Sequence, residues 1–157
     1  MATVTLKQHQ KRQFGGTPYG NLTAYVYELD TGTTGAALDS DSSVALAIGD
    51  VVDLGPLPEG MRLDGASIFV TVGMSASVTG SLGFKYEDGV DSADVPQDAV
   101  YFATGVDLAT TGRKTATGKS LATLPKAARL ILTTAGAANA KASELKVLVS
   151  GELTGPR

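Results

Sequence analysis

The chain has 157 residues, no cysteine, no tryptophan and a net charge of −3. A chain of this length is expected to form one domain, the lack of cysteine excludes disulfides and thiolate chemistry, and no apolar stretch approaches the ~20 residues that a membrane-spanning helix needs. With 19 glycines and only 6% aromatic residues, the composition predicts short strands joined by many turns, without a deep ligand cavity.

Residues 1–20 are predicted to form an extended N-terminal arm, ahead of a single domain at residues 21–157. Val4 and Leu6 alternate with polar residues as in a strand, so we expect the arm to dock on a neighbouring protein; a frayed terminus is the alternative. The charged residues of the arm are all basic: Lys7, Lys11 and Arg12. Because no apolar run follows these charges, we expect no signal peptide and synthesis in the cytoplasm.

The first strand of the domain is predicted at residues 21–29, and both of its faces carry apolar or aromatic side chains. Leu22, Ala24 and Val26 share one face, and Tyr25 and Tyr27 share the other. Tyrosine presents a large apolar ring with a polar tip and is common in protein interfaces. We therefore interpret Tyr25 and Tyr27 as an outward-facing pair that contacts another chain.

Apolar residues that alternate with polar ones predict seven further strands. They are expected at residues 44–48, 51–54, 66–74, 82–86, 99–108, 128–134 and 144–153. A small-residue turn after the stretch at residues 66–74 lets this stretch pair with residues 82–86 as an antiparallel hairpin. About eight strands with frequent turns predict an all-β fold, an antiparallel β-sandwich of jelly-roll or Greek-key type.

Two long polar segments are predicted as loops. Residues 110–123 contain Gly118-Lys119-Ser120, but a phosphate-binding loop needs a glycine where Arg113 stands, so we reject that motif. Residues 87–98 form the most acidic segment, with Asp88, Asp91 and Asp94. Carboxylates suit a hard cation such as Ca²⁺, but their spacing matches no calcium loop. We predict a solvated acidic loop and no metal.

Side chains that carry catalysis are scarce. His9 is the only histidine and lies in the polar arm, which argues against a nucleophilic triad and against zinc. The 16 acidic residues include possible glycosidase pairs, but the chain lacks the tryptophan that sugar clefts commonly use. We predict no enzymatic activity and no cofactor. A sugar-binding module stays an alternative, with Tyr25, Tyr27, Tyr86 and Tyr101 as stacking residues.

Charge is distributed in blocks. Residues 21–107 hold 14 acids against two bases, a net charge of −12, and residues 108–157 hold eight bases against two acids, a net charge of +6. Either surfaces of opposite sign meet between subunits, or the strands interleave and mix the blocks within the fold. The basic block has no dense Lys/Arg cluster and no aromatic stacking residues, which argues against a nucleic-acid partner.

The segment from residue 44 to residue 153 resembles small head proteins of tailed bacteriophages in its order of turns and strands. A Leu-Pro-Glu-Gly turn at residues 57–60 precedes a long strand, and a hairpin of the form Gly-Ser-Leu-Gly-Phe-Lys-Tyr-Glu-Asp-Gly follows at residues 80–89. An Asp-rich loop, an aromatic strand at residues 98–108 and a closing hairpin complete the pattern. The arm lies outside this resemblance.

The resemblance implies a capsid decoration, or cement, protein: a virion structural protein made in the host cytoplasm that binds the capsid exterior. Its implied partners are the major capsid protein, whose neighbouring subunits it bridges against internal DNA pressure, and further copies of itself as a dimer or trimer. The implied contacts are the arm residues Val4, Leu6, Lys7, Lys11 and Arg12, with Tyr25 and Tyr27 as a second interface. A phage tail or neck subunit, or a domain that binds host-surface carbohydrate, is the alternative.

Overall fold

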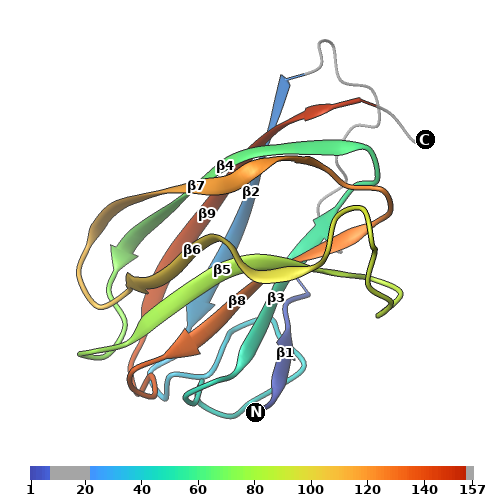
Figure 1. Ribbon diagram of the computed structural model, residues 1–157. Coiled ribbons are helices and arrows are strands. Elements are labelled where there is room, and N and C mark those ends of the chain that lie inside the picture. The colour runs from blue at the N-terminus through green and yellow to red at the C-terminus, as the bar shows by residue number, and fades with distance from the viewer. Residues whose placement is uncertain (8–21, 155–157) are drawn as a thin grey trace.

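The computed structural model describes residues 1–7 and 22–154. In these two ranges the chain forms nine strands and no helix, hence none that could cross a membrane. The strands are β1 (Thr3–Thr5), β2 (Leu22–Thr31), β3 (Val51–Leu57), β4 (Met61–Val72), β5 (Thr79–Tyr86), β6 (Asp98–Asp107), β7 (Gly112–Thr123), β8 (Ala128–Ala135) and β9 (Ser143–Leu153). They form two layers, with orders β1-β3-β8-β5-β6 and β2-β9-β4-β7 (Figure 1). The predicted all-β sandwich is confirmed.

The strand pairing is nested. β5 pairs with β6, β4 with β7, β3 with β8 and β2 with β9, and all four pairings are antiparallel. Eight strands wound in this way between two sheets form a jelly roll, one of the two predicted topologies. The predicted hairpin between β4 and β5 is wrong, because residues 73–78 cross between the layers and each strand buries its apolar face against the opposite sheet.

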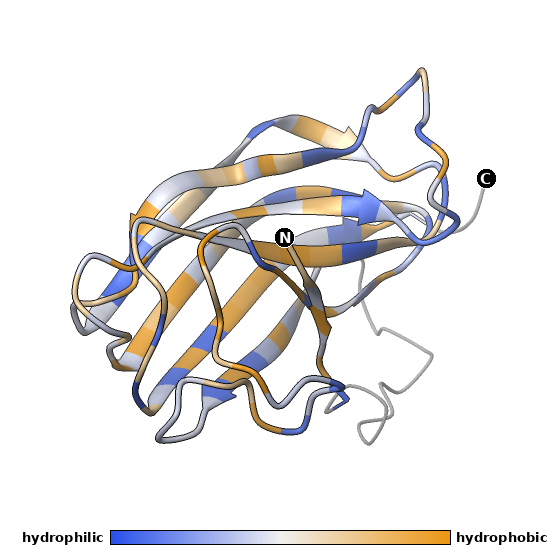
Figure 2. Ribbon diagram, turned by 90° about the horizontal axis from the view of Figure 1, so that it is seen from below, coloured by the Kyte–Doolittle hydropathy of each residue, from blue (hydrophilic) through white to orange (hydrophobic). Residues whose placement is uncertain are grey.

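The core lies between the two layers and is built mainly from alternate residues of the central strands. Leu145, Val147 and Val149 of β9 are buried, as the alternation predicts. On the neighbouring strand β4, Ile68 and Val70 are also buried and lie beside Val147 and Leu145. Figure 2 shows the resulting hydrophobic and hydrophilic bands along the strands. Aliphatic burial of this kind supplies most of the driving force for folding.

The two faces of β2 are the reverse of the prediction. Tyr27 is only 3% exposed and lies in the core, Tyr25 is half-buried, and Leu22 is 77% exposed on the opposite face. The Tyr27 hydroxyl donates a hydrogen bond of 2.6 Å to the carbonyl oxygen of Pro56. A buried tyrosine needs such a partner, and β3 of the facing sheet provides it. The prediction of an outward tyrosine pair is therefore corrected for Tyr27.

The first residues of the predicted arm belong to the sandwich. β1 pairs in parallel with β3, with Val4 opposite Val52, and Val4 and Leu6 are both buried in the core of this chain. This corrects the prediction that these two side chains contact another protein. It also means that removing residues 1–20 would remove core residues, so the deletion is not expected to leave the domain undisturbed.

Two segments differ from the predicted secondary structure. Residues 44–48 form part of a loop in which only Leu46 is fully buried, while Val44 is 70% and Ile48 62% exposed. Of residues 110–123, which were predicted as a loop, all but the first two form β7. β7 is an edge strand of its sheet, and an edge position tolerates a polar sequence rich in threonine, which favours extended backbone.

Candidate interaction surfaces

The predicted contact residues do not form one site. Lys7 is exposed directly after the buried Leu6, and its backbone N–H donates a hydrogen bond of 2.6 Å to the carbonyl oxygen of Asp39. Lys11 and Arg12 lie outside the described residues. Tyr25 lies on β2 of the four-stranded sheet, whereas Lys7 follows β1 of the five-stranded sheet. The structure therefore separates the basic residue of the arm from the tyrosine.

The tyrosines proposed as sugar-stacking residues are mostly inaccessible. Tyr27, Tyr86 and Tyr101 are each no more than 5% exposed, and only Tyr25 is half-buried. Burial raises the pKa of Tyr27, and the neighbouring Tyr25 raises it further. The Tyr86 hydroxyl donates to the carbonyl oxygen of Val95 at 2.5 Å. Three of the four rings thus serve the core and cannot stack on a sugar ring.

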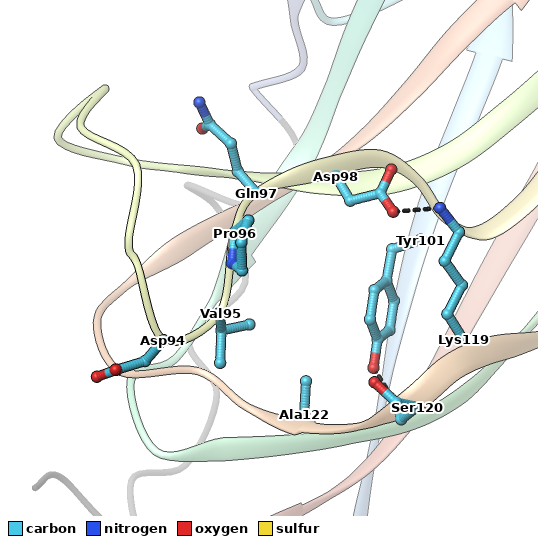
Figure 3. Close-up of a pocket in the computed structure, with 9 residues that line it drawn as sticks. All are labelled: Asp94, Val95, Pro96, Gln97, Asp98, Tyr101, Lys119, Ser120 and Ala122. Atoms are coloured by element: carbon cyan, nitrogen blue, oxygen red, sulfur yellow. Dashed lines mark hydrogen bonds and ion pairs between the residues drawn. The ribbon is translucent and has the colours of Figure 1, made fainter.

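A groove of about 360 Å³ lies where the edge strands β6 and β7 of the two sheets meet (Figure 3). Both edges are bulged there, between Leu82 and Phe84 in the β5–β6 register and between Leu63 and Gly65 in the β4–β7 register. Bulges bend an edge strand and stop it from pairing further. The groove is lined by Asp94, Val95, Pro96, Gln97, Asp98, Tyr101, Lys119, Ser120 and Ala122.

The polar groups of this groove pair with one another across the two sheets. The Tyr101 hydroxyl donates to the carbonyl oxygen of Ser120, and Lys119 forms an ion pair of 2.5 Å with Asp98. No nucleophile and base stand together among its lining residues, so the groove offers no constellation for acid–base or covalent catalysis. We interpret it as the seam that ties the edges of the two sheets and shields them from other strands.

The acidic loop at residues 87–98 does not gather its carboxylates. Asp88 accepts a hydrogen bond of 2.7 Å from Lys126, which lowers the pKa of Asp88. One Asp91 oxygen accepts from the backbone N–H of Gln97 at 2.7 Å. Among the described residues, no three acidic or histidine side chains form a metal site. The loop is held by its own backbone and by Lys126.

The end of the sandwich that carries the N-terminus exposes large apolar side chains on the loop at residues 32–50. Leu38, Val44 and Ile48 are all more than half exposed, and the sequence did not single them out because alternation placed two of them in a strand. The loop itself is fixed: Asp50 accepts hydrogen bonds from the backbone N–H groups of Ala2 and Ala47, each at 2.9 Å. Apolar side chains held on a rigid backbone are typical of protein contacts.

At one end of the outer face of the four-stranded sheet, two carboxylates oppose each other. Asp30 of β2 faces Glu144 of β9, and the Oδ1 atom of Asp30 is buried without a hydrogen-bond partner. Burial raises the pKa of Asp30, and the charges of Glu144 and Glu28 raise it further, while Lys146 lowers it. The fold therefore disfavours the charged form of Asp30.

Asp30→Asn is expected to stabilise the protein at pH 7 by about 0.5 kcal/mol, because like charges directly opposite each other on paired strands destabilise a sheet. The folded-state pKa lies above the unfolded value, so the penalty is full at neutral pH and disappears as the pH falls through the raised pKa towards 3.8. Urea unfolding at pH 7 and pH 4 measures the difference. A gain that is the same at both pH values, or an equal gain from the exposed Asp64→Asn, would contradict this explanation.

Comparison with solved structures identifies chains of the same fold in phage capsids. The chain is similar to a chain in the capsid of Ralstonia phage GP4, with a TM-score of 0.67 and 15% identity over 99% of both chains. It is also similar to a chain in the cyanophage Pam1 capsid asymmetric unit, with a TM-score of 0.55 and 17% identity over 90% of this chain and 92% of that one. No protein-family model and no curated protein matches the sequence. At these identities the likeness concerns the fold.

Proposed function

We propose that this chain is a virion structural protein that binds the outer surface of a phage capsid and cements neighbouring major capsid protein subunits. The observation that carries the proposal is that a chain from a phage capsid shares the jelly roll over almost its whole length. The resemblance of the sequence to small phage head proteins points the same way. The role is one of fastening, and the many paired polar groups of the surface serve the fold rather than a reaction.

The end of the sandwich that carries Lys7 is the proposed capsid contact. Lys7 lies beside the loop at residues 32–50 through its hydrogen bond to Asp39, so a basic residue and the exposed side chains of Val44 and Ile48 share one end of the fold. The arm residues Lys11 and Arg12 follow Lys7 in the sequence. On a lattice, several modest contacts of this kind combine through high effective concentration.

A host-surface carbohydrate-binding domain, or a phage tail or neck subunit, is the rival function. The burial of Tyr27, Tyr86 and Tyr101 argues against the carbohydrate reading, because stacking on sugars needs exposed aromatic faces. A glycan array with the purified chain tests it directly. Binding to a glycan without binding to capsids would favour the rival.

The test of the cement function is to add the purified chain to expanded capsids that lack decoration and to image the product. The proposal predicts ordered density on the outer surface at junctions between major capsid protein subunits, and capsids that resist heat or mechanical pressure better than undecorated ones. Absence of bound density at saturating protein would refute it.

Reversing the charge of the arm, with Lys7→Glu, Lys11→Glu and Arg12→Glu together, is expected to lower capsid occupancy at least tenfold. These substitutions leave the buried Val4 and Leu6 in place, so the sandwich is retained. Lys126→Glu at the acidic loop is the matched control and should bind normally. Occupancy that does not change in the triple variant would contradict the role assigned to the arm, whatever the fate of the cement proposal.

A further inference from the structure

The composition of the outer face of the four-stranded sheet follows from the strand register. Side chains of β2, β9, β4 and β7 that point away from the core line up in rows across the four strands. Two central rows carry no charge. They consist of Val26, Leu148, Ser67 and Thr115 in one row and of Ala24, Ser150 and Gly65 in the other.

Charged rows border this neutral centre on both sides. The row on one side is Leu22, Glu152, Arg62 and Thr123, and the row on the other is Glu28, Lys146, Phe69 and Arg113. The face is accessible in this structure, with Leu22 77% and Val26 39% exposed. We call the four rows together the outer β2–β7 face.

We propose that the outer β2–β7 face pairs with the same face of a second copy of the chain, about a two-fold axis that runs parallel to the strands between β9 and β4. This operation places β2 over β7 of the second copy and β9 over β4 of the second copy. Each row of one copy then lies over the same row of the other copy, in reversed order. An isologous contact of this kind requires a surface that is complementary to itself.

The charges of the bordering rows meet that requirement. Under the two-fold axis, Glu28 opposes Arg113 of the second copy. Glu152 opposes Arg62, again with opposite charge, and Lys146 lies over Phe69, an arrangement that favours a cation–π contact. Each of these three contacts occurs twice in the dimer, and none of the three places like charges opposite each other. Asp64 is exposed in the bulge between the Arg62 row and the Gly65 row and has no partner in the strand register. The neutral rows meet in the middle, where charge would be costly to bury.

One long charged side chain of this face, that of Arg113, already lies against the sheet. The Arg113 guanidinium lies over the Phe69 ring at 5.2 Å and reaches the Ser67 hydroxyl at 3.2 Å, so Arg113 lies along the sheet rather than standing away from it. Sheets pack face to face with their strands within about 30° of each other, which this axis permits.

The area of the face is sufficient. Four strands about 4.8 Å apart, over eight residues that rise about 3.4 Å each, cover roughly 500 Å² per copy. The pair would then bury roughly 1,000 Å², which reaches the lower bound for a specific protein interface. A smaller patch, such as the three apolar side chains of the loop at residues 32–50, would not support a dimer by itself.

The first test is sedimentation of the full chain without capsids, which keeps it independent of the cement function. The wild type is expected to dimerise at micromolar concentration. Val26→Arg, which introduces a charge into a neutral row, is expected to weaken dimerisation at least tenfold, whereas Val90→Arg on the acidic loop should have no effect. Circular dichroism spectra that match that of the wild type show that both variants fold, and the melting temperature of Val26→Arg is expected to fall only by the stabilisation that dimerisation supplies. A monomeric wild type at 100 μM, or a Val26→Arg dimer of normal strength, would overturn the proposal.

The second test addresses the axis. Glu28→Arg and Arg113→Glu should each prevent self-association, because each homodimer would hold two like-charged pairs. An equimolar mixture of the two variants should form a heterodimer, since both contacts are then again between opposite charges. Mass-tagged copies distinguish the species. The mixture of Asp88→Lys and Lys126→Glu, a pair far from the face, is the control. Failure of the mixed variants to associate would overturn the two-fold arrangement.

The same variants separate this proposal from capsid binding. If a chain that is monomeric through Val26→Arg still decorates capsids, self-pairing and the cement function are independent. If the wild type is monomeric and Val26→Arg instead loses capsid binding, the face contacts the capsid and the self-pairing proposal is overturned.

Discussion

Replacing Asn139 with alanine is expected to lower the free energy of unfolding by about 3–5 kcal/mol, because several buried polar groups would lose their partner at once, each at a cost of about 1–3 kcal/mol. Asn139 is 1% exposed. Its Nδ2 donates to the Thr31 hydroxyl at 3.0 Å and to the carbonyl oxygen of Lys141 at 2.9 Å. Its Oδ1 accepts from the backbone N–H of Ser75 at 3.0 Å.

These contacts explain why one amide affects so much of the fold. Asn139 joins the end of β2, the crossing at residues 73–78 and the turn between β8 and β9, three segments that belong to different parts of the jelly roll. Its backbone N–H also donates to the carbonyl oxygen of Leu46 at 2.9 Å, which fixes the loop at residues 32–50. Side-chain networks of this kind hold an irregular end of a sandwich in one arrangement.

Urea unfolding followed by circular dichroism measures the loss. Gln97→Ala is the matched control, because Gln97 is an exposed side-chain amide that accepts a hydrogen bond of 3.2 Å from the backbone N–H of Tyr86. We expect it to cost less than about 1 kcal/mol. An Asn139→Ala variant no less stable than Gln97→Ala would show that water replaces the lost contacts and that the network contributes little.

The sequence predicted the parts of the fold where one face is apolar and the other polar. Leu145, Val147 and Val149 alternate with charged or half-buried residues, and their strand and its inward face are both as expected. β2 has apolar residues on both faces, so alternation did not decide which face is buried. The choice depends on the Pro56 carbonyl oxygen that receives the Tyr27 hydroxyl, and this acceptor lies 29 residues further along the chain.

The contact surfaces were less predictable than the strands for a related reason. The alternation of Val4 and Leu6 correctly indicated a strand, but its partner is β3 of the same chain, in a parallel pairing that sequence periodicity does not reveal. The outer β2–β7 face combines residues from four strands spread over the whole domain. Its neutral centre and charged borders appear only when the register of those strands is known.

One buried ion pair joins the acidic and the basic block of the sequence within the fold. Arg129 comes from the basic block and Asp53 from the acidic block, and β3 and β8 are neighbours in the five-stranded sheet. The Nε atom of Arg129 donates to both carboxylate oxygens of Asp53 at 3.1 Å. The two side chains are 13% and 8% exposed. At this position the interleaving of strands, rather than contact between subunits, brings the opposite charges together.

Arg129→Met is expected to lower the free energy of unfolding by about 3–5 kcal/mol, because it leaves the carboxylate of Asp53 buried without its main counter-charge. The double variant Asp53→Asn with Arg129→Met should recover most of this loss, since a neutral amide is much cheaper to bury than a charge. The desolvation cost of the intact pair offsets much of its attraction, so the pair contributes little net stability even though breaking it is costly. Equilibrium unfolding of the two single variants and the double variant gives the coupling energy. If the double variant is as unstable as the sum of the single variants, the two charges do not compensate each other, and the stability of this part of the sheet depends on the packing of the Arg129 side chain instead.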